Sequence, residues 1–380
     1  MQFAKRVTPA VRLALLALTA AKVPAALAQQ TPAVSIDAAG TVHLPVFEVP
    51  LSSYMSPQAR QAFITAAHAP HEPEWDDVNA SITRLRELDE ADSKEFLEQA
   101  QARYPVRIEE GSLAGVHTRV ITPKEGVPPR NRSRVLIELH GGGFFSGAHA
   151  EALLESIPVA RVGGFKVVAV DYREGPEYRF PAASDDVAKV YRELLKQYRP
   201  ADIGLYGCSA GGTLSAMAIA WFQKEKLPRP GAIGILNAGA FGNFDAPPDN
   251  PGSWGGDSRY TTAPLTGDPP LPADPKQIPP LPAVMTAYMR GVNLADPLAS
   301  PALSRTVLAQ FPPSLVITST RGFDMSAAVE THRRLVNAGV PADLHVWDGV
   351  GHCFFTDVSL PESGEAFSVI TRFFDQHLGH

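Results

Sequence analysis

The chain has few cysteines, no excess of basic residues and no apolar run long enough to cross a bilayer comfortably. Only two of its 380 residues are cysteine, so no more than one disulfide can form within it. Lysine and arginine number 34 against 40 acidic residues, and the formal charge of −6 comes with no basic stripe that would attract a nucleic acid. The length and the 44% hydrophobic content allow one large α/β domain with an appended lid, or two modest domains.

The N-terminus has the three parts of a secretory signal peptide. Basic residues precede an apolar run over residues 13–21, and small residues at 26 and 28 form a cleavage site. The run is too short to span a bilayer and is closed by Lys22. We expect residues 1–28 to be removed, leaving an acidic, soluble protein without a membrane anchor that is periplasmic or secreted. An amphipathic N-terminal helix is the alternative.

Two segments lack regular strand–helix alternation and are expected to form a cap. In residues 29–105, helical patterns cover 57–68 and 76–102. Residues 241–300 are rich in proline and glycine, with scattered aromatic side chains and one helix expected over 281–292. Both segments are interpreted as parts of a lid, and a disordered insertion is the alternative for the second one.

Short apolar runs alternate with helical patterns over residues 106–240 and again over 301–380, which we assign to the core. Strands are expected at 116–121, 135–139, 165–170, 203–206, 232–236, 315–318 and 344–347. Helices are expected at 151–163, 182–198, 213–223, 325–338 and 364–378. This order is typical of an α/β protein with a mostly parallel central sheet and helices on both faces.

The stretch Gly207-Cys208-Ser209-Ala210-Gly211 is a Gly-x-Ser-x-Gly pattern between an apolar run and a helix. Strand, turn and helix in this order are the context of a nucleophile elbow. The tight turn forces a strained backbone on Ser209 and leaves no room for a Cβ at either glycine. The pattern predicts a nucleophilic serine oxygen at a helix N-terminus, and a glycine-rich turn with an idle serine is the alternative.

A second glycine-rich segment, His140-Gly141-Gly142-Gly143-Phe144, follows directly after a predicted strand. Backbone N–H groups of such a loop can approach a substrate oxygen and stabilise the oxyanion that forms in acyl transfer. The N–H of Ala210, the residue after the nucleophile, is the expected partner donor. A merely flexible loop is the alternative.

A serine nucleophile requires a base and a carboxylate that orients the base. His352 follows the last predicted strand, where a loop can place its imidazole beside the serine hydroxyl. Asp324 follows the strand at 315–318 and gives the chain order serine, acid, histidine. Asp348 is a second choice, and a helix N-cap is an alternative or additional role for Asp324.

Cys208 and Cys353 each adjoin one of these residues, which places the two cysteines in one neighbourhood if the triad forms. An oxidising compartment would permit a disulfide between them. Two buried thiols that act as small hydrophobic side chains are the favoured interpretation.

Together these motifs resemble those of the hormone-sensitive-lipase-like carboxylesterases, the bacterial branch of the α/β-hydrolase fold. The resemblance covers roughly residues 105–378 and rests on the segments at 140–144, 171–183, 207–212, 296–301 and 351–354 and on the Asp324 loop. It implies an α/β-hydrolase fold with a two-segment cap. It also implies a triad of Ser209, Asp324 and His352, with oxyanion donors at Gly142, Gly143 and Ala210.

Three positions depart from the family pattern. Cys208 replaces the usual acidic residue before the nucleophile, and Glu174-Gly175 replace a Leu-Ala pair. The stretch after Asp324 lacks the usual proline and second acid. None of the three changes affects the expected triad residues. The substrates of typical family members are a less direct guide to the substrate of this chain.

The sequence therefore predicts a serine carboxylic-ester hydrolase that acts on small to medium esters through an acyl-enzyme on Ser209. Phe144, Phe145 and Trp254 are expected either to line an acyl pocket or to pack in the core. An amidase or lactonase with the same triad, or a non-catalytic binding protein of this fold, are the alternatives. No metal, organic cofactor or nucleic-acid partner is expected; the acidic, histidine-rich patch at 68–77 matches no defined metal spacing. The oligomeric state is left open, a homo-oligomer included.

Overall fold

The computed structural model describes residues 34–38, 40–45, 48–69, 77, 79–244, 246, 249–266, 272, 277 and 283–379. The expected signal peptide lies outside these residues. The chain divides into two units, Met1–Pro50 and Leu51–His380. In the first unit, β1 (Ser35–Ile36) and β2 (Val42–His43) form a short antiparallel pair in which Ser35 lies opposite His43.

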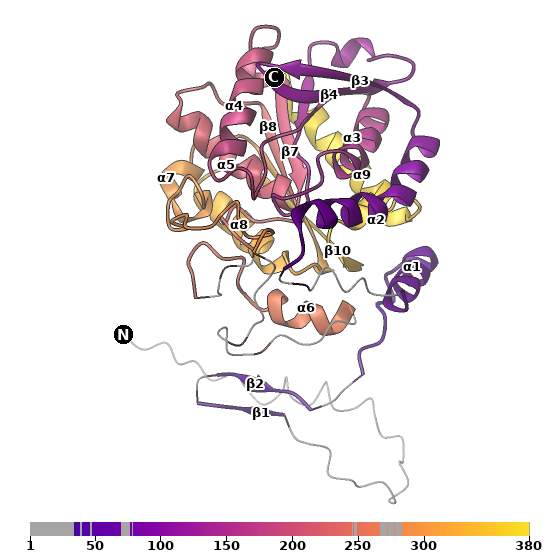
Figure 1. The fold of residues 1–380 in the computed structure, drawn as a ribbon, viewed down its shortest axis with the longest axis vertical. Helices are drawn as coiled ribbons and strands as arrows, with labels where there is room; N and C mark the ends of the chain where they lie inside the picture. The colour runs from indigo at the N-terminus through magenta and orange to yellow at the C-terminus, as the bar shows by residue number, and fades with distance from the viewer. Residues whose placement is uncertain are drawn as a thin grey trace, which may run out of the picture. The chain divides into compact units, whose positions relative to one another are not determined.

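The second unit contains an eight-stranded sheet in the order β10-β9-β8-β7-β5-β6-β4-β3 (Figure 1). Its strands are β3 (Val106–Leu113), β4 (Val116–Pro123), β5 (Val135–Glu138), β6 (Lys166–Val170), β7 (Ile203–Cys208), β8 (Ala232–Leu236), β9 (Ser314–Arg321) and β10 (Ala342–Gly351). The pairs β3–β4 and β4–β6 are antiparallel and all the others are parallel. The expected mostly parallel sheet is confirmed.

Strand β3 lies outside the predicted strands. Apolar alternation at Val106 and Ile108 stops at Glu109 and Glu110, so the local pattern does not indicate a strand. Its residues are largely exposed and it pairs with β4 at the end of the sheet. Charged side chains are common on such edge strands because they discourage pairing with another chain.

Nine α-helices are described, and three of them begin at serine caps, which for α7 is Ser304. The Ser56 hydroxyl accepts the N–H of Ala59, and the Ser81 hydroxyl accepts the N–H of Arg84. The helices are α1 (Pro57–Ala67), α2 (Ile82–Arg103), α3 (Ala150–Gly163), α4 (Ala182–Leu194), α5 (Ala210–Lys224), α6 (Ser258–Thr266), α7 (Arg305–Leu308), α8 (Met325–Asn337) and α9 (Pro361–His377).

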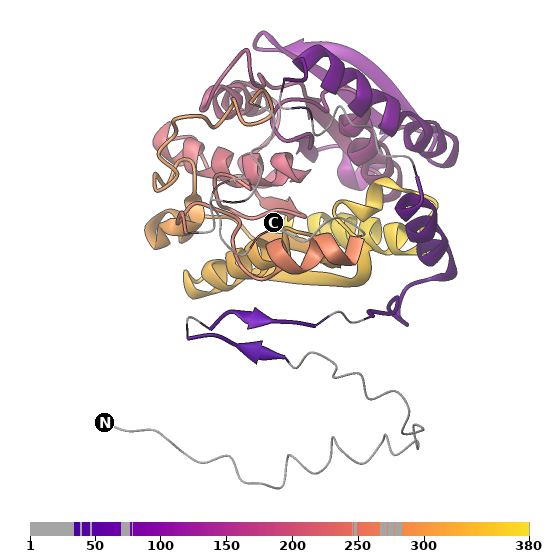
Figure 2. The same ribbon diagram turned by 60° about the horizontal axis from the view of Figure 1, so that its bottom comes forward.

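Successive side chains of each strand point to opposite faces of the sheet and pack into two separate hydrophobic cores. In β7, Ile203 and Leu205 pack into a cluster with residues of α4, α5 and α8, whereas Tyr206 and Cys208 pack into a cluster with residues of α3 and α9. The helices therefore cover both faces of the sheet, and Figure 2 shows the yellow α9 beside α3 although the two are far apart in sequence. All residues of β5 and β7 are buried, as expected for central parallel strands.

The helix expected over 281–292 is not present in the described part of that stretch. Residues 283–291 form consecutive turns instead. Proline at 282 and Gly291, which has a φ of 78°, leave only a short segment between them. So short a segment is a marginal helix because few hydrogen bonds offset the cost of nucleation.

Helix α2 of the expected N-terminal cap segment is fastened to the loops beside the glycine-rich segment. Arg86 donates from Nε to the carbonyl of Phe145 at 2.7 Å and from Nη2 to the carbonyl of Gly175 at 2.9 Å. It also forms an ion pair with Glu177 at 2.9 Å. The described contacts thus tie α2 to the core, while the boundaries of the cap stay a prediction.

Candidate active site

Strand β7 ends at the sharp turn that carries Ser209. This serine has a φ of 56° and a ψ of −124°, and α5 begins at the next residue. A Cβ added at Gly207 would lie 2.0 Å from the carbonyl oxygen of Leu139, and one added at Gly211 would lie 1.7 Å from the same atom. The strained serine and the two crowded glycines match the expected nucleophile elbow.

Gly211→Ala is expected to lower the free energy of unfolding by about 3 kcal/mol, because the methyl group must displace backbone atoms of the neighbouring strand. The matched control is Gly364→Ala in α9, where no atom lies within 4 Å of the added Cβ. Removing backbone freedom at that helical site is expected to stabilise the protein by roughly 0.5–1 kcal/mol. Urea unfolding measures both; equal effects at the two sites would show that the elbow is not closely packed.

The glycine-rich segment follows β5 and adopts left-handed backbone conformations at consecutive positions. Gly142, Gly143 and Phe144 have φ values of 81°, 60° and 64°. A Cβ at Gly142 would lie 2.1 Å from the carbonyl oxygen of Ser146. Within the described residues, the N–H groups of Gly142 and Gly143 have no acceptor, and Ala210 occupies the first turn of α5, whose N–H groups lack helical partners. The predicted oxyanion donors are therefore open for a substrate oxygen.

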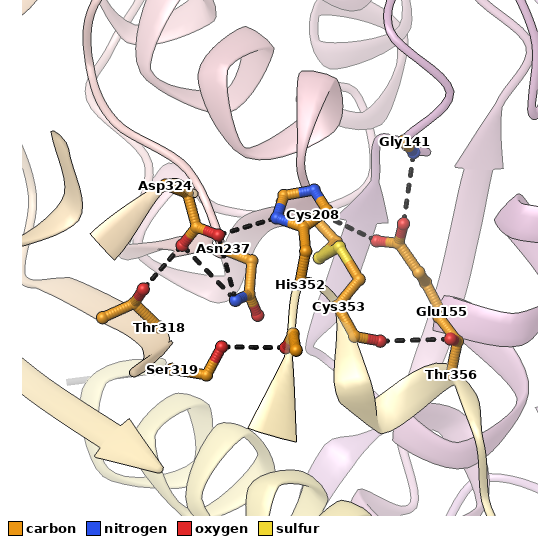
Figure 3. The surroundings of a disulfide bond; sticks show 11 residues. Gly141, Glu155, Cys208, Asn237, Thr318, Ser319, Asp324, His352, Cys353 and Thr356 are labelled. Carbon is orange, nitrogen blue, oxygen red and sulfur yellow. Dashed lines mark hydrogen bonds and ion pairs between the residues drawn. A yellow bond between two sulfur atoms is a disulfide. The ribbon is translucent and has the colours of Figure 1, made fainter. Parts of the chain in front are cut away.

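Asp324 and His352 form a close pair at the ends of β9 and β10. Nδ1 of His352 lies 2.7 Å from Oδ1 of Asp324, and the two side chains are 23% and 0% exposed (Figure 3). Asp324 occupies the N-cap position of α8 but makes no capping hydrogen bond, because its carboxylate is turned towards the histidine. The alternative role as a side-chain helix cap is thus not observed, whereas the expected contact between Asp324 and His352 is.

Two buried side chains that sequence reasoning missed hold the Asp324 carboxylate. Thr318 donates from Oγ1 to Oδ2 at 2.6 Å, and Asn237 donates from Nδ2 to the same oxygen at 3.4 Å. Thr318 lies on β9 and Asn237 directly follows β8, towards the carboxyl end of the strands where the other site residues lie. The sequence signal that could have identified them is that Asn237 follows an expected strand and Thr318 is the last residue of the expected strand at 315–318.

No hydrogen bond joins the Ser209 hydroxyl to His352 in the described structure. Both residues are partly exposed, unlike the buried Asp324. Hydrogen bonds of this kind are often long in unliganded enzymes and tighten when the substrate binds.

The aromatic residues expected near the site fall into two groups. Phe144 and Phe145 are each 5% exposed, and Phe144 stacks on Tyr288 with ring centroids 4.8 Å apart. The structure therefore places these two among core residues. Trp254 is also buried, but it stacks on Phe323, whose ring lies 4.3 Å from that of His352. Phe323, which the sequence reasoning did not assign to the site, therefore stacks directly on the candidate base.

The favoured interpretation of two free thiols is wrong. Cys208 and Cys353 form a disulfide with their Cα atoms 6.3 Å apart, within the usual range for this bond (Figure 3). The pairing was missed because 145 residues separate the two cysteines in sequence, and only the folded chain brings the ends of β7 and β10 together.

A buried carboxylate joins the nucleophile elbow to the glycine-rich segment. Glu155 of α3 accepts the N–H of Cys208 at 2.8 Å and the N–H of Gly141 at 3.1 Å. Although Cys208 replaces the usual acidic residue before the nucleophile, a carboxylate still lies beside the elbow, supplied by another helix. A charged residue within the apolar stretch at 152–160 was the available signal.

Further acidic groups surround Glu155 behind the glycine-rich segment. Glu138 is 0% exposed and the side chain of Glu174 is 10% exposed. Burial raises the pKa of both Glu155 and Glu174 to about 8, and it raises the pKa of Glu138 well above its usual value, with the neighbouring Glu155 adding to the shift. Burial also lowers the pKa of His140 to about 4, so this imidazole is neutral at physiological pH.

The free energy of unfolding is expected to fall as pH rises from about 4.5 to about 8. Over that window the folded chain holds protons on Glu155 and Glu174 that the unfolded chain has released, so raising the pH favours unfolding. Glu138→Gln, which removes one buried acid, should flatten this dependence, whereas Glu98→Gln on the exposed surface of α2 should not. Urea unfolding across the window tests this; an unchanged slope in Glu138→Gln would contradict it.

The described residues contain no group of three or more side chains arranged to hold a metal. Most of the acidic, histidine-rich patch at 68–77 lies outside these residues. No helix within the described part of the chain has the length and apolar character needed to traverse a membrane.

Comparisons with known proteins agree with this architecture. A family model described as alpha/beta hydrolase fold matches residues 136–356. The chain is 28% identical to an acetyl-hydrolase of Streptomyces hygroscopicus over 65% of its own length and 77% of that protein. It is also 28% identical to an ethyl acetate hydrolase of Pseudomonas putida, over 66% of its own length and 75% of that protein.

Solved structures give the same result. The crystal structure of an esterase called E25 superposes with a TM-score of 0.74 at 28% identity, covering 89% of this chain and 99% of the other. An esterase from the bacterial hormone-sensitive lipase family superposes with a TM-score of 0.63 at 28% identity, covering 82% of this chain and 100% of the other. The chain therefore belongs to the α/β-hydrolase fold family, and its resemblance to the hormone-sensitive-lipase-like carboxylesterases is confirmed.

Proposed function

We propose that the protein hydrolyses carboxylic esters of small to medium size through an acyl-enzyme on Ser209. The observation that carries this proposal is the His352–Asp324 pair, with its 2.7 Å contact. It lies at the carboxyl end of the parallel strands, where β7 is followed by the strained Ser209. The open N–H groups of Gly142 and Gly143 support it, because a developing oxyanion needs preorganised donors.

In the proposed mechanism, each of the three side chains has a distinct role. Since Nδ1 of His352 faces Asp324, Nε2 is left to take the proton from Ser209 as its oxygen attacks the ester carbonyl. Asp324 fixes this tautomer and stabilises the imidazolium that forms. His352 then protonates the leaving alcohol and afterwards activates the water that hydrolyses the acyl-enzyme.

The proposed substrates have short acyl groups. Two similar proteins are named for acetyl and ethyl acetate hydrolysis, which supports this choice. The Phe323 ring, which stacks on His352 and on Trp254, supplies an apolar surface next to the proposed base.

Hydrolysis of p-nitrophenyl esters of graded acyl length tests the proposal. We expect turnover of the acetate and butyrate and a steep loss with long acyl chains. A matched p-nitroanilide and a simple lactone address the amidase and lactonase alternatives. If the protein hydrolyses none of these esters, the proposal is contradicted. Saturable binding of an ester without turnover would indicate a binding protein of this fold instead.

We further propose that the protein is exported after removal of residues 1–28. The Cys208–Cys353 disulfide supports this, because such bonds persist in oxidising compartments and are rare in the cytosol. Intact-mass measurement of the protein from the exported fraction should give a chain that begins at residue 29. Recovery of the full-length chain only from the cytosol would contradict export.

A further inference from the structure

The disulfide joins the immediate neighbours of two proposed catalytic residues. Cys208 directly precedes Ser209, and Cys353 directly follows His352. We propose that this disulfide positions His352 against Ser209. Ester hydrolysis then requires the two cysteines to be in their oxidised, disulfide-bonded form. This inference rests on the proposed function, and it assigns Cys208 and Cys353 as positioning residues that act through their neighbours.

Cys208 is the fixed end of the link. It is completely buried as the last residue of β7, where it is paired with Leu236 of β8. Its N–H is also held by the Glu155 carboxylate at 2.8 Å, and the Ser209 N–H donates to the Leu236 carbonyl at 2.9 Å. These hydrogen bonds therefore fix the backbone of the proposed nucleophile to the central strands of the sheet.

The histidine end is held less firmly by the fold itself. Strand β10 lies at the edge of the sheet, and its pairing with β9 is irregular between Trp347 and Gly351, immediately before His352. Cys353 has a φ of 46°, in the left-handed region that a non-glycine residue rarely adopts. Such a conformation persists only where other contacts hold it, and the covalent bond to Cys208 is one of them.

The noncovalent contacts described for the His352 side chain involve residues other than Ser209. Asp324 holds Nδ1, and Phe323 covers one face of the ring. The Ser319 hydroxyl donates to the Gly351 carbonyl at 2.8 Å, and the Thr356 hydroxyl donates to the Cys353 carbonyl at 3.1 Å (Figure 3). None of these contacts sets the separation between His352 and Ser209, whereas the disulfide spans the same two loops.

The separation matters because a general base must lie within about 2.6–3.2 Å of the proton-bearing atom. A misplacement of about 1 Å costs on the order of 100-fold in rate. Cleaving the disulfide should therefore lower kcat by about 100-fold, with little change in KM, because the oxyanion donors and the acyl-binding wall stay in place.

Reduction by a dithiol is the chemical form of this test. One thiolate attacks Sγ of the partly exposed Cys353, and the fully buried Cys208 leaves as a thiolate that takes a proton. The second thiol of the reductant then displaces Cys353 as a thiol and closes a cyclic disulfide. The protein gains two electrons and two protons, which the dithiol supplies.

The experiment compares oxidised wild type, wild type reduced with dithiothreitol, and the double variant Cys208→Ala, Cys353→Ala. The kcat and KM for p-nitrophenyl butyrate are measured together with far-UV circular dichroism. We expect both bond-free forms to stay folded and lose about 100-fold in kcat, reoxidation with oxidised glutathione to restore the wild type, and dithiothreitol to leave the double variant unchanged.

The outcomes separate this inference from the proposed function. Oxidised wild type that hydrolyses no ester would overturn the function itself. Active wild type whose kcat survives reduction and the double substitution would leave the function intact and overturn the positioning role. Loss of the folded signal along with activity would also overturn it, because the bond would then support the fold as a whole rather than the position of His352.

Discussion

Ser209→Ala is expected to lower kcat for ester hydrolysis by about a million-fold, the loss measured when the nucleophile of such a triad is removed. The substitution deletes the oxygen that forms the acyl-enzyme, while the glycine-rich donors remain. Ser209 is the last residue before α5, and its side chain makes no hydrogen bond within the described structure, so the fold should be retained. Steady-state assay with a p-nitrophenyl ester measures the effect.

Ser368→Ala is the matched control. Ser368 lies on the exposed side of α9 and donates its hydroxyl only to the Gly364 carbonyl within its own helix. Its kcat should equal that of the wild type. Comparable hydrolysis by the Ser209→Ala protein would assign the activity to another group or to a contaminant.

Asp324→Asn is expected to lower kcat by about ten-thousand-fold with little loss of folded protein. The amide has nearly the same shape as the carboxylate and can still accept from Thr318. It no longer carries the charge that stabilises the imidazolium, and its NH2 group favours the wrong histidine tautomer. Rates at saturating ester concentration, combined with a urea unfolding curve, separate the catalytic effect from any loss of stability.

Asp348→Asn tests the alternative assignment of the triad acid. The Asp348 carboxylate accepts hydrogen bonds from Thr320 at 2.9 Å and from Ser52, and no hydrogen bond joins it to His352 among the described residues. The variant should keep its kcat within about twofold. A large loss at Asp348 together with a small loss at Asp324 would reverse the assignment.

The positions of the three proposed triad residues were predictable because each comes after, or close to the end of, a strand that the sequence indicates. Ser209, Asp324 and His352 come directly after or close to the ends of β7, β9 and β10, which run parallel. The carboxyl ends of parallel strands lie on the same side of the sheet. Local patterns and chain order were therefore sufficient to predict that these three residues lie near one another. The glycine-rich segment after β5 follows the same logic.

The contacts that support the triad were not predictable, because each joins elements far apart in sequence. Glu155 reaches Cys208 from α3, and Asn237 reaches Asp324 from the end of β8, 87 residues away in sequence. Burying a carboxylate normally opposes folding, so a sequence pattern gives no reason to place Glu155 beside backbone N–H groups. The disulfide likewise depends on a distance that only the assembled sheet defines.

Local patterns also failed where packing decides between weak alternatives. The apolar residues at 281–292 suggested a helix, yet residues 283–291 form turns. Strand β3 carries two adjacent glutamates but is fixed by pairing with β4 along its length. At β3 this pairing outweighed intrinsic preference, which is a small free-energy term, whereas the segment at 283–291 is too short to offset the cost of helix nucleation.

Covalent labelling tests the central claim, that Ser209 is the nucleophile of this triad, most directly. The protein is incubated with diethyl p-nitrophenyl phosphate, which phosphorylates activated serines, and the adduct is located by peptide mass spectrometry while residual ester hydrolysis is followed. We predict one adduct per chain on Ser209, with activity lost in proportion to labelling and with no labelling in Asp324→Asn on the same timescale. Full hydrolysis by labelled protein, or an adduct on another residue that accounts for the lost activity, would contradict the account.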